Sequence, residues 1–77
     1  MAKYNFNYMA LTVNFWVGVD DSARYGYFEH KERGDECSGG LWFHGRELIN
    51  YDGVPKLPHE VVSALRKKGY IVNKEFD

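Results

Sequence analysis

The stretch that decides the fold is LWFHGRELINY followed by DGVPKLPHEVVSALRKKGY, which together are residues 41–70 of a 77-residue chain. Its first part, residues 41–51, has apolar residues on both sides of His44-Gly45, and this arrangement is typical of a β-hairpin. Glycine adopts a positive φ freely and histidine tolerates it better than most residues. We therefore predict a type I′ turn at these two positions.

A helix is predicted for residues 58–68. Pro58 suits its first position, where the missing N–H would have no partner in any case. Gly69 follows the last turn and supplies the left-handed residue that commonly ends a helix. The side chains expected to face the sheet are Val61, Val62, Ala64 and Leu65.

The N-terminal quarter of the chain alternates between apolar and polar residues, but the alternation changes phase. The first apolar set is Tyr4, Phe6 and Tyr8, and from Met9 to Val19 the apolar residues take the odd positions. Because a shift of one residue turns every side chain to the other face of a strand, we predict a bulge or bend at residues 8–10. A single strand over residues 9–19 would span about 36 Å, more than the roughly 30 Å diameter of so small a domain. The run is therefore either strongly twisted or broken near Asn14.

Two further segments precede the hairpin. Residues 24–31 alternate as a strand, with Tyr25 and Tyr27 on one face and Phe28 and His30 on the other. Residues 32–40 contain three glycines and four charged side chains, a composition that predicts a mobile loop and not a core element.

Together these segments predict one domain over residues 1–77, of the α+β class. An antiparallel sheet of about four strands would occupy residues 3–51, with the single C-terminal helix packed across one face. Ile71 and Val72 would form a short final strand or a docked tail.

Composition excludes several classes of protein. Ten basic and eleven acidic side chains lack the basic excess that binding to a phosphate backbone normally requires. Cys37 is the only cysteine, so no internal disulfide is expected. No apolar run reaches the ~18–20 residues of a membrane span, and the first residues lack the apolar core of a signal peptide. We predict a cytoplasmic protein that does not associate with membranes.

Catalysis and metal binding are weakly indicated. Cys37 with His44 or His30 supplies the residue types of a thiol site, but the adjacent Asp35 and Glu36 suppress the thiolate. The closely spaced ligand pairs of a zinc site do not occur among the cysteine and the three histidines. We predict no catalytic residues, no metal and no cofactor.

The most informative feature for function is a surplus of aromatic residues: six Tyr, five Phe and two Trp. Trp16 alternates with Phe15, and Trp42 with Phe43, so the second face of the sheet also carries rings. Either these rings fill both sides of the helix–sheet core or some are exposed as anchors for another molecule. The residues predicted to contact a partner protein are Trp16, Tyr25, Tyr27, Asp35, Glu36 and Trp42.

Two other interactions are considered. A small nucleic-acid-binding module would use basic residues at the end of the helix together with stacking tyrosines. Its candidate residues are Lys56, Arg66, Lys67 and Lys68. The stretch Tyr-Asn-Phe-Asn-Tyr, residues 4–8, also has the composition of an edge strand that could pair with another chain, which predicts a homodimer as one option.

In its organisation the chain resembles the small accessory proteins of phages and mobile elements, of which anti-CRISPR proteins are the best-known group. The resemblance covers the size, the near-neutral charge and the aromatic-rich sheet with one helix, and no motif. It implies a non-enzymatic protein that inhibits a host defence complex by stoichiometric binding, with a Cas effector subunit as the partner.

Overall fold

The computed structural model describes the backbone of residues 6–20 and 22–76, and the side chains of residues 12–20 and 22–76. Five strands are followed by one α-helix and a short 3₁₀-helix. Their bounds are β1 Phe6–Leu11, β2 Phe15–Asp20, β3 Tyr25–His30, β4 Gly34–His44, β5 Glu47–Tyr51, α1 His59–Lys67 and η1 Lys74–Phe76.

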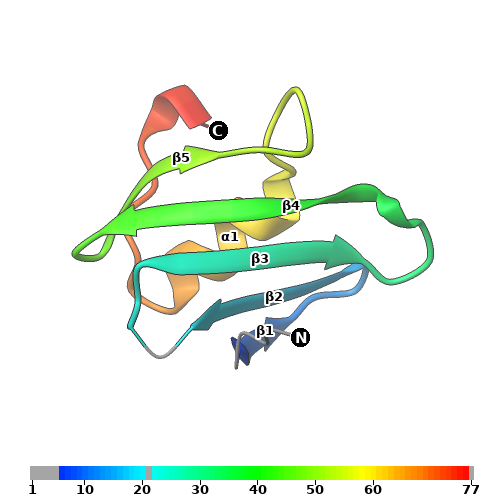
Figure 1. The fold of residues 1–77 in the computed structure, drawn as a ribbon, viewed down its shortest axis with the longest axis horizontal. Helices are drawn as coiled ribbons and strands as arrows, with labels where there is room; N and C mark the ends of the chain where they lie inside the picture. The colour runs from blue at the N-terminus through cyan, green and yellow to red at the C-terminus, as the bar shows by residue number, and fades with distance from the viewer. Residues whose placement is uncertain (1–5, 21, 77) are drawn as a thin grey trace.

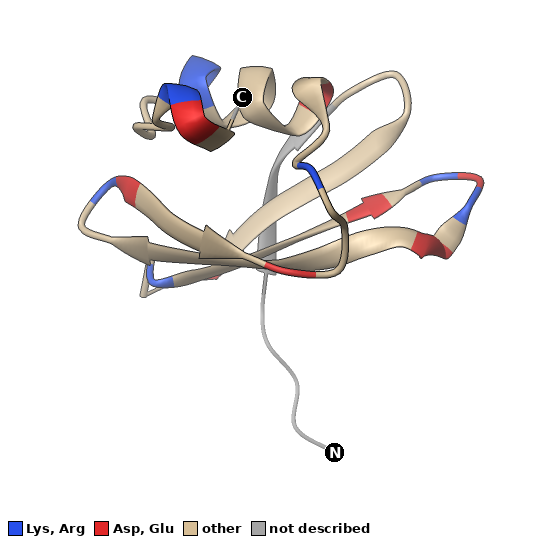
Figure 2. Cartoon of the chain, turned by 90° about the horizontal axis from the view of Figure 1, so that it is seen from above, with Lys and Arg blue, Asp and Glu red and all other residues tan. Residues whose placement is uncertain are grey.

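The strands form one antiparallel sheet in the order β1-β2-β3-β4-β5, so that every strand pairs with its neighbour in sequence. Figure 1 views the sheet with α1 behind it, and Figure 2 shows the same two layers from above, with α1 on one side of the sheet only. The predicted α+β class, an antiparallel sheet with one C-terminal helix on a face, is confirmed. The sheet has five strands where about four were expected.

The core lies between α1 and the sheet face toward it. It consists of alternate residues of the strands, the four predicted residues of the helix and two residues that flank the helix. Its members are Phe15, Val17, Val19, Phe28, Leu41, Phe43, Leu48, Leu57, Val61, Val62, Ala64, Leu65 and Val72. Among the described residues no polar or charged side chain is buried, so burial of apolar area is what holds the two layers together.

The extra strand arises because the long N-terminal run breaks. Thr12 and Phe15 close a turn, in which the Phe15 N–H donates to Thr12 Oγ1 at 2.8 Å. This resolves the alternative left open by the sequence, and it leaves Val13 at the turn with 84% of its surface exposed. The predicted bulge is confirmed, since the pairing of β1 with β2 shifts between Tyr8 and Ala10. The part of the predicted edge strand at residues 4–5 lies outside the described residues.

The prediction of a mobile loop at residues 32–40 is wrong. Only Lys31, Glu32 and Arg33 form the turn, and β4 begins at Gly34. Pairing with β3 passes from His30↔Gly34 to Glu29↔Ser38, so residues 35–37 bulge out of the strand. Charged side chains are tolerated here because Asp35 and Glu36 are exposed in this bulge.

The glycines of this segment are required by a close approach of two backbone segments. After β5 the chain crosses beside β4, where the Asp52 N–H donates to the Gly40 carbonyl at 3.1 Å. The Gly40 N–H in turn donates to Asp52 Oδ1 at 2.8 Å. A Cβ on Gly39 would overlap the carbonyl group of Asp52, and one on Gly53 would overlap the carbonyl group of Ser38. Glycine at both positions lets the segments meet.

The hairpin between β4 and β5 exists, but its turn differs from the predicted type. His44 pairs with Glu47, so the central residues are Gly45 and Arg46. Gly45 has φ 66°, and Ala23 is the only non-glycine with positive φ in the described chain. A type I′ turn needs positive φ at both central positions, whereas glycine at the first position alone is the pattern of a type II′ turn.

Arg46 also ties this hairpin to the end of the helix. Its Nε donates to the Gly69 carbonyl at 3.0 Å and its Nη2 to the Lys68 carbonyl at 2.9 Å. The guanidinium lies over the Tyr70 ring, 4.6 Å from the ring centroid. These contacts place a positive charge at the C-terminus of α1, which the helix dipole favours.

The ends of α1 follow the sequence closely. Pro58 is the N-cap, with ψ 140°, and not the first helical residue. At the other end Gly69 has φ 92°, its N–H bonds the Arg66 carbonyl, and the Tyr70 N–H bonds the Leu65 carbonyl. This pair of bonds is a Schellman motif. The predicted final strand is reduced to a single parallel bridge between Glu47 and Ile71.

The N-terminal turn of α1 is tied to the β1–β2 turn by Glu60. Its two carboxylate oxygens accept hydrogen bonds from the backbone and side chain of Asn14, at 3.2 and 2.7 Å. The bond from the Asn14 side chain is the main reason why the pKa of Glu60 lies below its ordinary value, with smaller contributions from Thr12 and the charge of His30.

We expect Gly39→Ala to lower the free energy of unfolding by about 3 kcal/mol, because the new methyl group meets backbone that cannot move aside. Gly40→Ala is the matched control, since its Cβ would lie 3.0 Å from the indole of Trp42, a side chain that can shift. Urea denaturation of both variants measures the difference. Equal losses would contradict the close approach of Asp52 to Gly39.

Glu60 makes stability depend on pH in a defined direction. A carboxyl whose pKa is lowered by folding stabilises the native state above its unfolded pKa, and the contribution disappears as the pH falls through the folded value. We expect the Tm of the wild type to fall below about pH 4.5 and Glu60→Gln to remove part of that fall. Glu75→Gln, in η1, is the control. Identical pH profiles for wild type and Glu60→Gln would contradict the role of the Asn14 contact.

Candidate functional site

The candidate site is the sheet face that α1 does not cover, called here the helix-free face. Strand pairing defines its residues, because directly paired residues lie on the same face of a sheet. Tyr25 pairs with Trp42, Tyr27 pairs with Gly18 and Gly40, and Trp16 pairs with Glu29. None of the four rings belongs to the core. The structure therefore brings together four of the six residues predicted to contact a partner.

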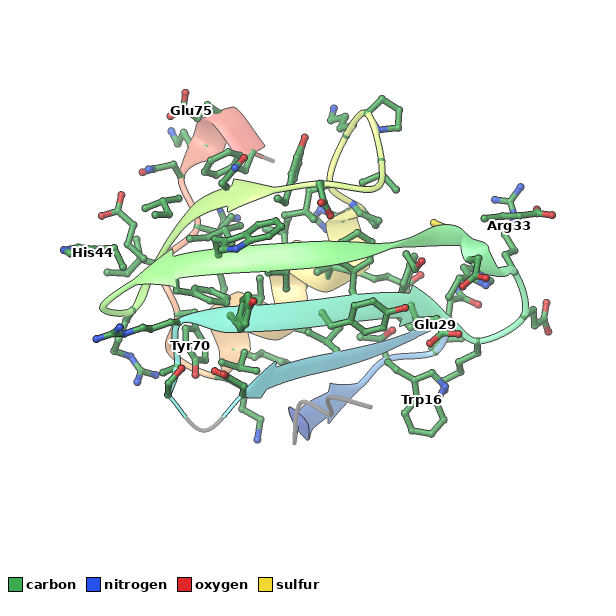
Figure 3. The ribbon with its side chains drawn as sticks, in the orientation of Figure 1. Trp16, Glu29, Arg33, His44, Tyr70 and Glu75 are labelled. Carbon is green, nitrogen blue, oxygen red and sulfur yellow. The ribbon has the colours of Figure 1, made fainter. Side chains whose placement is uncertain are left out.

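One end of the helix-free face is formed by Trp16 and its neighbours. Trp16 is 40% exposed and projects from the body of the molecule, with Glu29 close by on β3 (Figure 3). The ammonium group of Lys31 lies 5.6 Å from the centroid of the indole. An exposed indole beside both a cation and a carboxylate can make apolar, cation–π and charge-assisted contacts with another molecule.

The other end is formed by Trp42 and Tyr25, whose ring centroids are 6.2 Å apart at an angle of 56°. Both residues are half-buried. The Trp42 indole lies over Gly40, within 3.0 Å of where a Cβ would be, so glycine lets the ring lie against the sheet. The carboxylate of Asp52 accepts the Gly40 N–H and adds a negative charge beside this end.

Between the two ends lies a row in which Tyr27 has glycine on both sides, Gly18 on β2 and Gly40 on β4. Neither neighbour has a side chain that could cover the tyrosine, which is half-buried. This row contributes the Tyr27 ring, beside the Trp42 indole that lies over Gly40, and both ends of the face carry indoles. A surface with several large rigid rings suits the recognition of another protein surface.

The two acidic residues predicted to contact a partner are placed differently from the rings. Asp35 and Glu36 are exposed in the bulge at the start of β4. They lie beyond Glu29 at the Trp16 end of the sheet, and Trp42 lies at the opposite end. They can extend the helix-free face at one end only.

The basic residues of the nucleic-acid alternative lie in the layer of α1 and the connection before it, not on the helix-free face (Figure 2). Arg66, Lys67 and Lys68 are exposed at the C-terminus of α1, and Arg66 donates to the Val72 carbonyl at 2.6 Å. Tyr25 and Tyr27 are on the other side of the molecule. The stacking tyrosines and the basic patch therefore do not form one surface.

The residues considered for thiol chemistry or zinc are also spread apart. Cys37 is at the start of β4 and His44 at its end, roughly 23 Å away along an extended strand. His30 packs edge-on against Phe15 and accepts the Glu32 and Arg33 N–H groups at its Nδ1, both at 3.1 Å. In the part of the chain that the structure describes, no three or more His, Cys, Asp or Glu side chains are grouped to hold a metal ion.

No helix in the described ranges 6–20 and 22–76 has the length and apolar character needed to cross a membrane. A scan against protein-family models, a search of curated proteins and a search of solved structures each found no match. Fold and site together define a small single-helix α+β protein with an aromatic face on its open sheet side.

Three charged residues of the site were not among the contacts predicted from the sequence. Glu29 follows Tyr25 and Tyr27 at intervals of two residues on β3, so alternation alone could have placed it on the same face. Lys31 is two residues further along, just past the end of the strand. Asp52 gave no local signal, because it reaches Gly40 only through the chain crossing after β5.

Because Phe15 and Trp16 are neighbours on β2 but lie on opposite faces of the sheet, we expect their substitution to affect stability differently. We expect Phe15→Ala to lower the free energy of unfolding by about 3–5 kcal/mol, because it empties a buried site. Trp16→Ala should lower it by less than about 1 kcal/mol, because the indole is largely outside the core. Chemical denaturation measures both values. A larger loss from Trp16→Ala than from Phe15→Ala would place the indole in the core.

Proposed function

We propose that the chain is a non-enzymatic protein-binding module and that the helix-free face is its binding surface. The observation that carries this proposal is that Trp16, Tyr25, Tyr27 and Trp42 share the one sheet face that no helix covers. Tryptophan and tyrosine are the residues most enriched among those that dominate binding energy at protein interfaces, together with arginine.

The charges around the face support a protein partner over a nucleic acid. Glu29 and Asp52 lie beside the two indoles, and Asp35 and Glu36 extend one end. A surface with these carboxylates would repel a phosphate backbone. Lys31 lies at the Trp16 ring, and the basic residues of α1 are in the other layer. The alternative of a nucleic-acid-binding module is thereby disfavoured.

A narrower proposal concerns the kind of partner. The resemblance in organisation to anti-CRISPR proteins implies an inhibitor that acts by stoichiometric binding, with a Cas effector subunit as the target. The cytoplasmic location predicted from the sequence is where such a partner would be met. This narrower proposal rests on the resemblance alone, and it is tested by asking whether purified chain blocks cleavage by a reconstituted Cas effector.

The main test compares two double variants, each of which truncates two apolar side chains. The face variant combines Trp16→Ala and Trp42→Ala. The control variant combines Val13→Ala and Ile49→Ala, which are exposed apolar residues outside the set of four rings. The wild type and both variants are each used as bait in a bacterial lysate. Captured proteins are purified, and their affinity for each form of the chain is measured by titration. We expect the face variant to weaken binding at least about 30-fold, equivalent to about 2 kcal/mol, and the control to retain it.

Capture of the same proteins at equal strength by the face variant would contradict the proposed surface. A fluorescence titration with single-stranded oligothymidylate of about 20 nucleotides tests the alternative. Binding that falls steeply with salt, and that Lys67→Ala with Lys68→Ala removes, would establish the nucleic-acid module instead.

A further inference from the structure

The two edges of the sheet differ in how well they are closed. β5, at one edge, has two features that hinder pairing with a further strand. The Leu48 N–H bonds the Ile71 carbonyl at 2.9 Å, so this part of the edge is already occupied. Ile49 has no partner in β4, since Phe43 pairs with Leu48 and Trp42 with Asn50, and such a bulge distorts the edge.

β1, at the other edge, is more open, although it also contains a bulge. Among the described residues no strand pairs with its outer side. The sequence from residue 4 to residue 19 contains no Asp, Glu, Lys, Arg or His. Natural edge strands commonly carry charged residues, lysine above all, or a proline that interrupts the row of open hydrogen-bonding groups. Phe6–Leu11 has neither, and only the bulge at Met9 interrupts it.

We propose that β1 pairs antiparallel with β1 of a second copy of this chain, about a two-fold axis. In such a pair each strand faces its own sequence, so any charged residue would face or neighbour a like charge. The neutral composition of β1 removes that penalty, and this favours a second copy as the occupant. The proposal goes beyond binding at the helix-free face and does not depend on it.

The bulge predicts where the axis lies. Because it interrupts the regular ladder at Met9, continuous pairing is available to the preceding residues, Phe6, Asn7 and Tyr8. A two-fold axis through this segment, perpendicular to the sheet, joins the two sheets into one and leaves both helix-free faces on the same side. The dimer would then present two copies of the aromatic face to one partner surface, which strengthens binding through effective concentration.

Sedimentation velocity of the purified chain tests the proposal. The shared segment is short, so the interface falls in the weak class, and we expect the mass to rise from monomer toward dimer between about 10 µM and about 500 µM. Tyr8→Lys puts a charge in the segment proposed to pair, at the position whose backbone pairs with Gly18. We expect it to abolish association. Ile49→Lys, on the closed edge, is the matched control and should leave association unchanged.

Disulfide cross-linking supplies a second measurement that does not need a destabilising charge. Single cysteines are placed at positions 6, 7 and 8 in turn, in a Cys37→Ser background, and oxidised. Antiparallel pairing brings only the positions close to the axis within disulfide range. We expect one or two adjacent positions to cross-link efficiently, and a cysteine at position 49 to give no more than background.

Three results would overturn the proposal. The first is a monomer mass at every concentration. The second is association that survives Tyr8→Lys but is lost with Trp42→Ala, which would make the helix-free face the site of self-association. The third is equal cross-linking at all three positions, which indicates parallel pairing or random collision. Each is distinguishable from failure of the protein-binding proposal, which concerns capture of a different protein.

Discussion

One helix of nine residues has to cover a sheet of five strands, and the rest of the structure depends on this constraint. Such a helix is about 14 Å long, whereas five strands spaced about 4.8 Å apart occupy roughly 24 Å. Even the covered face is completed by residues outside the helix, Leu57 before it and Val72 after it. Nothing in the described chain remains to cover the second face, so the rings there stay outside the core.

Glycine at a few positions allows the close contacts on which this small fold depends. Gly39 and Gly53 let two backbone segments meet without side chains between them, which fixes the connection after β5 and brings Asp52 to the sheet. Gly18 and Gly40 flank Tyr27 on the helix-free face, and Gly40 lets the Trp42 indole lie against the strand. Glycines that allow the fold thus also determine how the Trp42 indole lies and where the Asp52 carboxylate sits on the proposed binding surface.

The proposed functions of the sheet face and the sheet edge follow from one property of the chain. Its chemically reactive residue types are dispersed, with Cys37 and His44 at opposite ends of β4 and His30 engaged with the turn and Phe15. Its aromatic residues are instead gathered by strand pairing. A surface on which aromatic rings are gathered is suited to contact with another macromolecule.

Local sequence determined much of this protein. Alternation showed that Trp16 opposes Phe15 and that Trp42 opposes Phe43, and Gly69 ended the helix as expected. Alternation, however, shows only which residues of one strand share a face. It does not show which faces of neighbouring strands lie on the same side of the sheet. Trp16, Tyr25, Tyr27 and Trp42 share one face only because the β2–β3 connection, the turn at residues 31–33 and the bulge at the start of β4 set the registers. A shift of one residue would move a whole strand's side chains to the other face. The strand from Gly34 to Gly40 could not be predicted for a related reason. Gly39 and Gly40 lie against Asp52 and Gly53, which are distant in sequence and adjacent only in the folded chain.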